Sequence, residues 1–598
     1  MGMIRLHRHA AVALIMAAVL QTQSTFAAEA AAQDHGVDRP MASDPVLPTF
    51  PTFRVYAPEV QKLWIEALSR PEADVRLLAA RAIAATASPD MRDNGELGTK
   101  LRSIVNNAKE SRELRRLAAQ SLVAFDSRGA EADLLAANKS GDEEIILLTD
   151  PCLAAWKNSE AQALWTARLQ DKTAPSQTIR SAIQSLSHAR TAAARQPLLA
   201  IAKDDSREMG VRLAAAQALA KLEPLNADEL AAVEKLALIR DGGERLLAAT
   251  ILTAGKDAES QRLLMTLAHD RDPAIATIAA VRLFTIAPSA LYPLAEEFRI
   301  SNETPLRKIA MLVFQQRKGV EDTARIAGSL GDLSPSVRAA AREALIALDA
   351  DAALHASVRS AAKAALDGIE WRSLEQAALV LGTLREESVA ERLLELAVSK
   401  QTEVRVAALV ALRRIDDPKT LPRQLVRARK LAALLQEAYR LGKTAEELAK
   451  SRASDEELAQ LLQTFGLKRY AEAEPFLISC MAANSDVGEP SRAAAAWALG
   501  FLHAGGPDAA TSTACQNVVK EQNERSLVRQ MAAVTLGRMR DATAKALLKE
   551  RAEKEANAVG EACRWAYAAM TGETLAPRPG VVSGGELLPF NPVGGTGK

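Results

Sequence analysis

One helical phrase recurs along the chain and limits the folds that are open to it. Its clearest copy, SPSVRAAAREALIAL, covers Ser334–Leu348. Apolar residues such as Val337, Ala341 and Leu345 recur at steps of three and four, which places them in one stripe on a helical face. Pro335 stands where a first helical turn tolerates a missing N–H. The phrase therefore predicts an amphipathic helix.

The copies of this phrase are regularly spaced in the middle of the chain. From Val211 to Val337 their first residues are about 31 to 33 positions apart. Each copy follows another amphipathic stretch, such as Ala324–Leu330, and a short turn with Asp, Pro or Gly. One unit is then a helix–turn–helix with too little core to stand alone, so it must stack on its neighbours. The copies begin at Val75, Leu114, Ile179, Val211, Glu244, Ile275, Leu306, Val337, Ser373, Val404, Ser491 and Val528.

The phrase D/P-x-V-R-x-x-A-A-x-A-L at this spacing resembles HEAT repeats, particularly the short class found in phycobilisome-lyase-like proteins, over about residues 59–572. The resemblance implies an all-α, right-handed α-solenoid of about 13 stacked antiparallel helix hairpins, with the second helices on the concave face. It also implies that the Arg after the first apolar residue joins a ladder with acidic residues of neighbouring turns. Ala276 and Leu374 replace that Arg in two copies. The implied ladder consists of Arg76, Arg115, Arg180, Arg212, Arg245, Arg307, Arg338, Arg405, Arg492 and Arg529.

Residues 1–30 have the layout of a secretory signal peptide. Arg5 and Arg8 form a basic start, Ala10–Leu20 is an apolar core, and small residues near Ala27 offer a cleavage site. An apolar run of this length is too short to span a bilayer, and no later segment predicts a transmembrane helix. We therefore expect the leader to be removed and the mature protein to be soluble and exported, either periplasmic or extracellular.

Composition divides the remaining chain. Residues 31–58, rich in Pro, predict an extended arm. Regular HEAT-like repeats are expected over 59–404, degenerate or lengthened repeats over 405–490, and C-terminal repeats over 491–573. Residues 574–598, rich in Gly and Pro, predict a flexible tail.

Charge and cysteine content exclude several kinds of site. The formal net charge is +1, so binding of nucleic acid is not predicted. The four cysteines include no CxxC pair, which argues against zinc and iron–sulfur sites. Cys480 and Cys515 fall on what we interpret as neighbouring outer helices. Either they form a disulfide, or the cysteines are small buried residues.

The search for catalytic constellations is negative. The sequence contains no HExxH motif, no Gly-rich phosphate loop before a helix and no G-x-S-x-G elbow. The histidines after the leader stand far apart: His35, His188, His269, His355 and His503. We therefore predict a non-enzyme without catalytic, cofactor-binding or metal-binding residues.

Trp497 is unusual among the second helices. It lies in the copy SRAAAAWAL, and the same column carries Arg81, Gln217 and Glu343 in other copies. This column lies off the apolar stripe, and the resemblance places it toward the concave side. An exposed Trp there would be a binding hot spot, whereas a Trp packed on the adjacent helix would be structural. These four residues are the candidate partner surface.

The leading functional hypothesis is a non-catalytic, exported protein-interaction scaffold of a bacterial cell envelope. Stacked repeats offer a long surface, so the partner would be a protein or peptide bound on the concave face. An alternative is a structural subunit of an envelope assembly, held through its N- and C-terminal tails. A lyase-like HEAT enzyme is a third reading, but resemblance of the repeat unit transfers no activity.

Overall fold

The computed structural model describes residues 40–47, 58–87, 95–222, 224–440, 445–483, 485–555 and 557–576. Their regular secondary structure is helical, with no strand among them. These residues form two compact units. One, the N-unit, holds residues 58–291; the other, the C-unit, holds residues 292–576 together with residues 40–47. Each unit is an α-solenoid.

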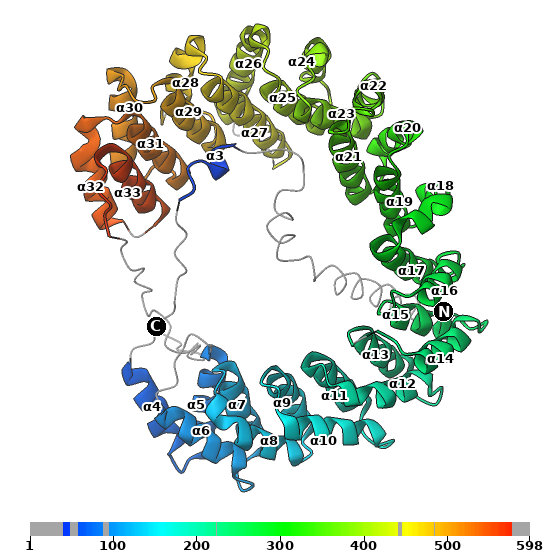
Figure 1. Cartoon of the computed structure of the whole chain (residues 1–598). Coiled ribbons are helices and arrows are strands. Elements are labelled where there is room, and N and C mark those ends of the chain that lie inside the picture. Colours follow the sequence, from blue (N-terminus) through cyan, green and yellow to red (C-terminus); the bar gives the residue numbers. More distant parts are fainter. Residues whose placement is uncertain are drawn as a thin grey trace. The chain divides into compact units, whose positions relative to one another are not determined.

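The N-unit is a row of helix pairs (Figure 1). In each pair the first helix packs on the second, and each second helix also packs on the second helix of the next pair, as α5, α7 and α9 do. The pairs are α4 (Pro58–Leu68) and α5 (Ala73–Thr86), α6 (Glu96–Asn106) and α7 (Arg112–Ala124), α8 (Glu131–Lys139) and α9 (Glu143–Ala155), α10 (Ser159–Gln170) and α11 (Ser176–Ala189), α12 (Arg195–Lys203) and α13 (Met209–Ala220), α14 (Ala227–Ala237) and α15 (Gly242–Leu252), α16 (Ala258–Ala268) and α17 (Pro273–Ile286).

The C-unit follows the same plan. Its pairs are α18 (Ala295–Arg299) and α19 (Thr304–Arg317), α20 (Val320–Gly328) and α21 (Pro335–Asp349), α22 (His355–Leu366) and α23 (Trp371–Thr383), α24 (Ala390–Leu396) and α25 (Thr402–Arg414), α26 (Leu421–Arg440) and α27 (Ala445–Leu467), α28 (Glu474–Met481) and α29 (Glu489–Leu502), α30 (Ala509–Lys520) and α31 (Ser526–Met539), α32 (Lys545–Lys554) and α33 (Ala558–Thr571). Short 3-10 turns precede or follow several helices: η1 (Arg128–Ala130), η2 (Ala192–Ala194), η3 (Pro288–Leu294), η4 (Ser329–Gly331), η5 (Glu387–Val389), η6 (Pro418–Thr420), η7 (Ala471–Ala473) and η8 (Ala542–Ala544).

The repeated phrase forms the second helices, as predicted. In α21, Val337, Ala341 and Leu345 are completely buried, whereas Glu343 is exposed. Pro335 lies in the first turn of the helix, where its missing N–H costs no hydrogen bond. The all-α solenoid expected from the periodicity is confirmed.

The region predicted to hold degenerate or lengthened repeats contains two long helices, α26 and α27, of 20 and 23 residues. The Glu457 side chain of α27 is fully buried between two guanidinium groups. Its carboxylate accepts from Arg405 of α25 at 2.9 Å and from Arg427 of α26 at 2.7 Å. One buried carboxylate therefore ties the long pair to the repeat before it.

Several segments expected from the sequence lie outside the described residues. The predicted leader falls in residues 1–39, and residues 577–598 of the predicted tail are also outside. Of the arm expected to be extended, residues 40–47 are described, and Pro40–Ser43 form one helical turn, α3. In the part of the chain that the structure describes, no helix has the length and apolar character needed to cross a membrane.

Candidate functional site

Most of the predicted ladder arginines donate to a carboxylate that belongs to the next repeat. These ion pairs are Arg76–Glu110, Arg212–Glu244, Arg245–Asp270, Arg307–Asp332, Arg405–Glu457, Arg492–Glu524 and Arg529–Glu555. Arg180 lies farther from Glu208, at 3.8 Å. Arg338 donates instead to the backbone carbonyls of Asp332 and Leu333, at 2.9 and 3.2 Å. Arg115 forms no ion pair within the described ranges.

The electrostatics of this ladder indicate a structural role. Burial alone would raise the pKa of Asp332, but hydrogen bonds from Arg307 and from the Ser334 N–H bring it below its usual value. The pKa of Asp270 is lowered in the same way, against burial, by Arg245. These two carboxylates are thus kept ionised and engaged with their own chain. The ladder joins consecutive repeats and leaves few groups for a partner.

The four residues of the predicted partner surface lie in different surroundings. In the N-unit, Arg81 is exposed and pairs with Glu113 at 2.6 Å, and Gln217 is half-buried. In the C-unit, Glu343 is exposed, but Trp497 has an exposed fraction of 0%. Of the two alternatives for Trp497, the structure shows the packed side chain and not the exposed one.

The middle of α29 is enclosed on all sides, because residues Ser491 to Gly500 are all buried. Helices α27 and α31 flank it and α28 packs against it. The ring of Phe501 meets Trp497 edge-on with centroids 4.5 Å apart. The guanidinium of Arg538 from α31 lies over both rings, 5.4 Å from Trp497 and 4.2 Å from Phe501, at cation–π distance.

Residues 40–47 cover the remaining side of this helix. They lie beside α27, α29 and α31 (Figure 1). The Trp497 Nε1–H donates to the Asp44 carbonyl at 2.7 Å, and Arg538 pairs with the Asp44 carboxylate. The Met41 N–H donates to Gln463 Oε1 at 3.1 Å. Three consecutive second helices each contribute one polar contact to this segment.

We call Gln463, Trp497, Phe501 and Arg538 the second-helix cluster. Its ring surface is apolar, and the two groups that reach Asp44 are both donors. Burial lowers the pKa of Arg538, and its Nη1 has no hydrogen-bond acceptor among the described residues. The cluster is therefore suited to a segment that presents a backbone carbonyl and a carboxylate.

Gly466 lets α27 and α29, two helices of the cluster, approach closely, and Gly537 does the same for α31 and its neighbour α33. A Cβ on Gly466 of α27 would lie 2.6 Å from the Ala498 Cα of α29. A Cβ on Gly537 of α31 would lie 2.6 Å from the Ala566 Cα of α33. Real Cβ atoms do not approach that closely, so only Gly fits. Close packing brings side chains from three repeats within reach of one short segment.

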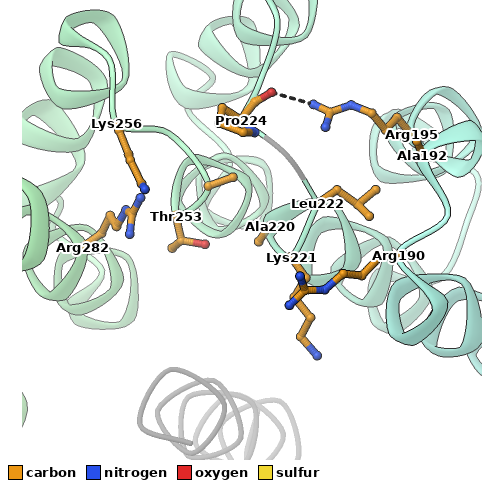
Figure 2. Close-up of a pocket in the computed structure, with 11 residues that line it drawn as sticks. Arg190, Ala192, Arg195, Ala220, Lys221, Leu222, Pro224, Thr253, Lys256 and Arg282 are labelled. Atoms are coloured by element: carbon orange, nitrogen blue, oxygen red, sulfur yellow. Dashed lines mark hydrogen bonds between the residues drawn. The ribbon is translucent and has the colours of Figure 1, made fainter. Parts of the chain in front are cut away.

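A basic cavity of about 360 Å³ lies in the N-unit (Figure 2). Its lining includes Arg190, Arg195, Lys221, Lys256 and Arg282. The described lining contains no carboxylate, and the residue between Leu222 and Pro224 lies outside the described residues. These cations come from helices and turns of successive repeats, so linear sequence motifs do not show the cavity. Its charge favours anionic groups.

Two of these cations already have acceptors. Arg195 forms an ion pair with Glu229 and donates to the Pro224 carbonyl at 3.1 Å (Figure 2). Arg282 donates to the Gly255 carbonyl at 2.9 Å, and burial lowers its pKa. Part of the positive charge is therefore used to fasten the turns.

Asp150 of α9 is a fully buried carboxylate that the sequence search missed. Its Oδ1 accepts from Asn138 and from the Trp165 indole, and its Oδ2 accepts from Arg168 and Ser181, at 2.7 to 2.8 Å. Each of the two carboxylate oxygens therefore accepts two hydrogen bonds from neighbouring side chains. This network fills the seam between α8, α9, α10 and α11, and its saturation indicates a structural role.

One group of side chains has the composition of a metal site. Ligand atoms of Glu474, His503 and Asp508 lie within 4.8 Å of one another, and all three residues are half-buried. His503 Nε2 already contacts Glu474 Oε1 at 2.8 Å. Asp508 caps α30 by accepting from the Thr511 N–H at 2.8 Å, which lowers its pKa. These local hydrogen bonds explain why the three side chains lie close together, so their proximity does not by itself indicate a metal site.

The Cys480–Cys515 disulfide, one of the two alternatives that the sequence left open, is not formed: all four cysteines are free. The Cys515 sulfur faces the Met481 sulfur at 3.9 Å rather than Cys480. Burial raises the pKa of the Cys480, Cys515 and Cys563 thiols to about 12, as expected of packed, unreactive side chains. The alternative expectation, small buried residues, describes these three; Cys152 is half-buried.

Comparisons with known proteins were made at the level of sequence and of structure. No protein-family model matches the sequence, and no curated protein is significantly similar to it. Similar solved structures include Kap95p bound to RanGDP, at 13% identity over 86% of this chain and 72% of that chain, TM-score 0.49. Importin beta crystallised with ammonium sulfate matches at 13% identity over 86% and 72%, TM-score 0.47. Yeast importin-beta (Kap95p) matches at 13% identity over 86% and 84%, TM-score 0.46. Chains this different transfer no partner or activity.

Proposed function

We propose that this protein is a non-catalytic, exported scaffold that binds a protein or peptide on the second-helix face of its repeats. The observation that carries the proposal is the seating of residues 40–47 on the second-helix cluster. That contact has the form of peptide recognition, since it combines an aromatic surface, an indole donor and a charged donor. A face that holds one short segment this way has the chemistry to hold another.

Export is supported by the layout of residues 1–30, with basic residues before an apolar core and small residues after it. The partner would then be periplasmic or extracellular. No bond is made or broken in this function; affinity comes from the surface alone.

The alternative of an assembly subunit requires tails that are free to bind other proteins. Residues 40–47 belong to the N-terminal tail, yet they are engaged with the C-unit. This contact favours the scaffold over tail-mediated assembly.

Site-specific photocrosslinking tests the proposal. A photoreactive residue at Gln463, which is buried beneath residues 40–47, probes the second-helix cluster, and one at the exposed Lys549 of α32 is the control on a first helix. With the full exported chain in intact cells, we expect a discrete crosslinked protein from position 463 and not from 549. The same crosslinks from both positions, or none from 463, would contradict the proposal.

A further inference from the structure

The segment 40–47 meets the C-unit as a ligand would rather than as part of a repeat. Its contacts join residues 422 to 494 positions apart in the sequence. None of the residues of α3 is buried, and the exposed fraction of Val46 is 84%. The cluster beneath it, by contrast, includes the completely buried Trp497. The segment therefore covers a core without contributing a core side chain of its own.

We propose that residues 40–47 are a built-in competitor for the second-helix cluster, and that the cluster's partner is a peptide segment carrying a carboxylate next to an accepting backbone carbonyl. This inference rests on the proposed function and adds the chemical class of the partner. In the structure Asp44 supplies both acceptors: its carbonyl accepts from Trp497, and its carboxylate accepts from Arg538.

The charge of Arg538 explains why the partner must be acidic. The Arg538 side chain is 12% exposed, and Asp44 is its ion-pair partner among the described residues. Removing that carboxylate without replacement would leave a buried cation unpaired, which is strongly unfavourable. An incoming peptide displaces Asp44 only if it brings a carboxylate of its own, so neutral peptides of similar shape are excluded.

The tether makes the competition efficient. A segment on the same chain has an effective concentration in the millimolar range when its linker spans the distance. The apparent affinity for a partner is reduced by the fraction of time that the cluster is occupied. Releasing the segment is therefore expected to strengthen binding in trans on the order of ten- to a hundredfold.

The test uses the mature chain and a fluorescently labelled peptide with the sequence of residues 39–48, RPMASDPVLP. Fluorescence anisotropy compares four proteins: the unaltered chain, a chain lacking residues 31–47, Asp44→Ala and Val46→Ala. Val46→Ala is the matched control, because Val46 is exposed. We expect ten- to a hundredfold tighter binding by the deletion and by Asp44→Ala, and no change with Val46→Ala. Adding Arg538→Gln to the deletion should abolish binding, as should Asp→Asn in the peptide.

Equal binding by the unaltered and deleted chains would overturn the inference, and so would a folded deletion variant that binds no peptide. If the deletion variant loses its helical circular dichroism signal, Asp44→Ala, which keeps the backbone, decides the question. An Asp44→Ala variant that binds the peptide no more tightly than the unaltered chain would then overturn the inference.

The crosslinking experiment separates this inference from the function on which it rests. If a partner is crosslinked equally at position 463 in the unaltered and deleted chains, residues 40–47 do not compete with it. The proposed scaffold function would still hold. If the deleted chain binds the peptide more tightly but no partner is crosslinked at position 463, the scaffold function would be contradicted instead.

Discussion

The same repeat column carries different chemistry in different repeats. In the N-unit it presents Arg81, which is exposed, and Gln217, which is half-buried. In α29 and α31 of the C-unit it presents Trp497 and Val534, both completely buried. The difference is local, because Glu343 of α21, also in the C-unit, is exposed. The backbone plan is shared, so the side chains in one column decide where a solenoid holds a segment and where it stays open to water.

Trp497→Ala gives the largest expected effect on this comparison. Truncating a completely buried Trp leaves a cavity and should lower the free energy of unfolding by about 3–5 kcal/mol. Chemical denaturation measures the loss, and hydrogen exchange should show it first in α29 and residues 40–47, since repeats couple mainly to their neighbours. A loss below about 1 kcal/mol would mean that the column is not part of the C-unit core.

Gly537→Ala tests whether close helix approach is needed for the apolar column. The new Cβ would meet Ala566 of α33, and overpacking of this kind should cost about 1–3 kcal/mol. Gly506→Ala is the matched control, because a Cβ there meets nothing within 4 Å. Thermal unfolding of both variants measures the difference. An equal shift in Tm for the two variants would show that close helix approach at Gly537 does not matter for stability.

Glu386→Gln tests whether a charged turn stabilises the fold as the buried apolar residues of the column do. A hydrogen bond from the Ser388 hydroxyl, followed by bonds from Arg359 and Lys363, lowers its pKa to about 2. A depressed folded-state pKa stabilises the protein above the unfolded value near 4.5, and this contribution is lost as pH falls toward 2. Glu386→Gln should therefore cost about 1–2 kcal/mol at pH 7.

The difference between Glu386→Gln and the unaltered chain should shrink between about pH 5 and pH 2. Urea denaturation at a series of pH values measures it. A difference that is constant with pH would show that packing, rather than charge, is responsible.

Arg81→Ala and Gln217→Ala should have the smallest effects. The Arg81–Glu113 pair is about half exposed, and exposed ion pairs contribute about 0–1 kcal/mol. Each change is expected to stay within about 0.5 kcal/mol by the same denaturation assay. A loss of stability comparable to that of Trp497→Ala would show that Arg81 and Gln217 contribute to the fold as much as the buried residues of the column.

Periodicity was sufficient to predict the seam and the helix pairs, because Val337 and Leu345 owe their burial to local helical geometry. The position of Trp497 toward one face was equally local. Its cover was not, since Asp44 lies 453 positions away and contacts it through a single indole hydrogen bond. The Asp150 network and the basic cavity also escaped prediction, because their members come from several helices and share no spacing. The choice between a Cys480–Cys515 disulfide and buried free thiols could not be made from the sequence, because spacing does not show that Cys515 lies against Met481.

Contact between backbones at Gly466 and Gly537 has a mechanical consequence. Packed protein interiors are nearly incompressible, so helices that already touch at this depth have no room to move closer. Local bending that compresses this face is therefore blocked, while bending that opens it is not. The stretch from α27 to α33 should therefore resist closing around a segment that it binds, so the segment can leave or return without the face narrowing.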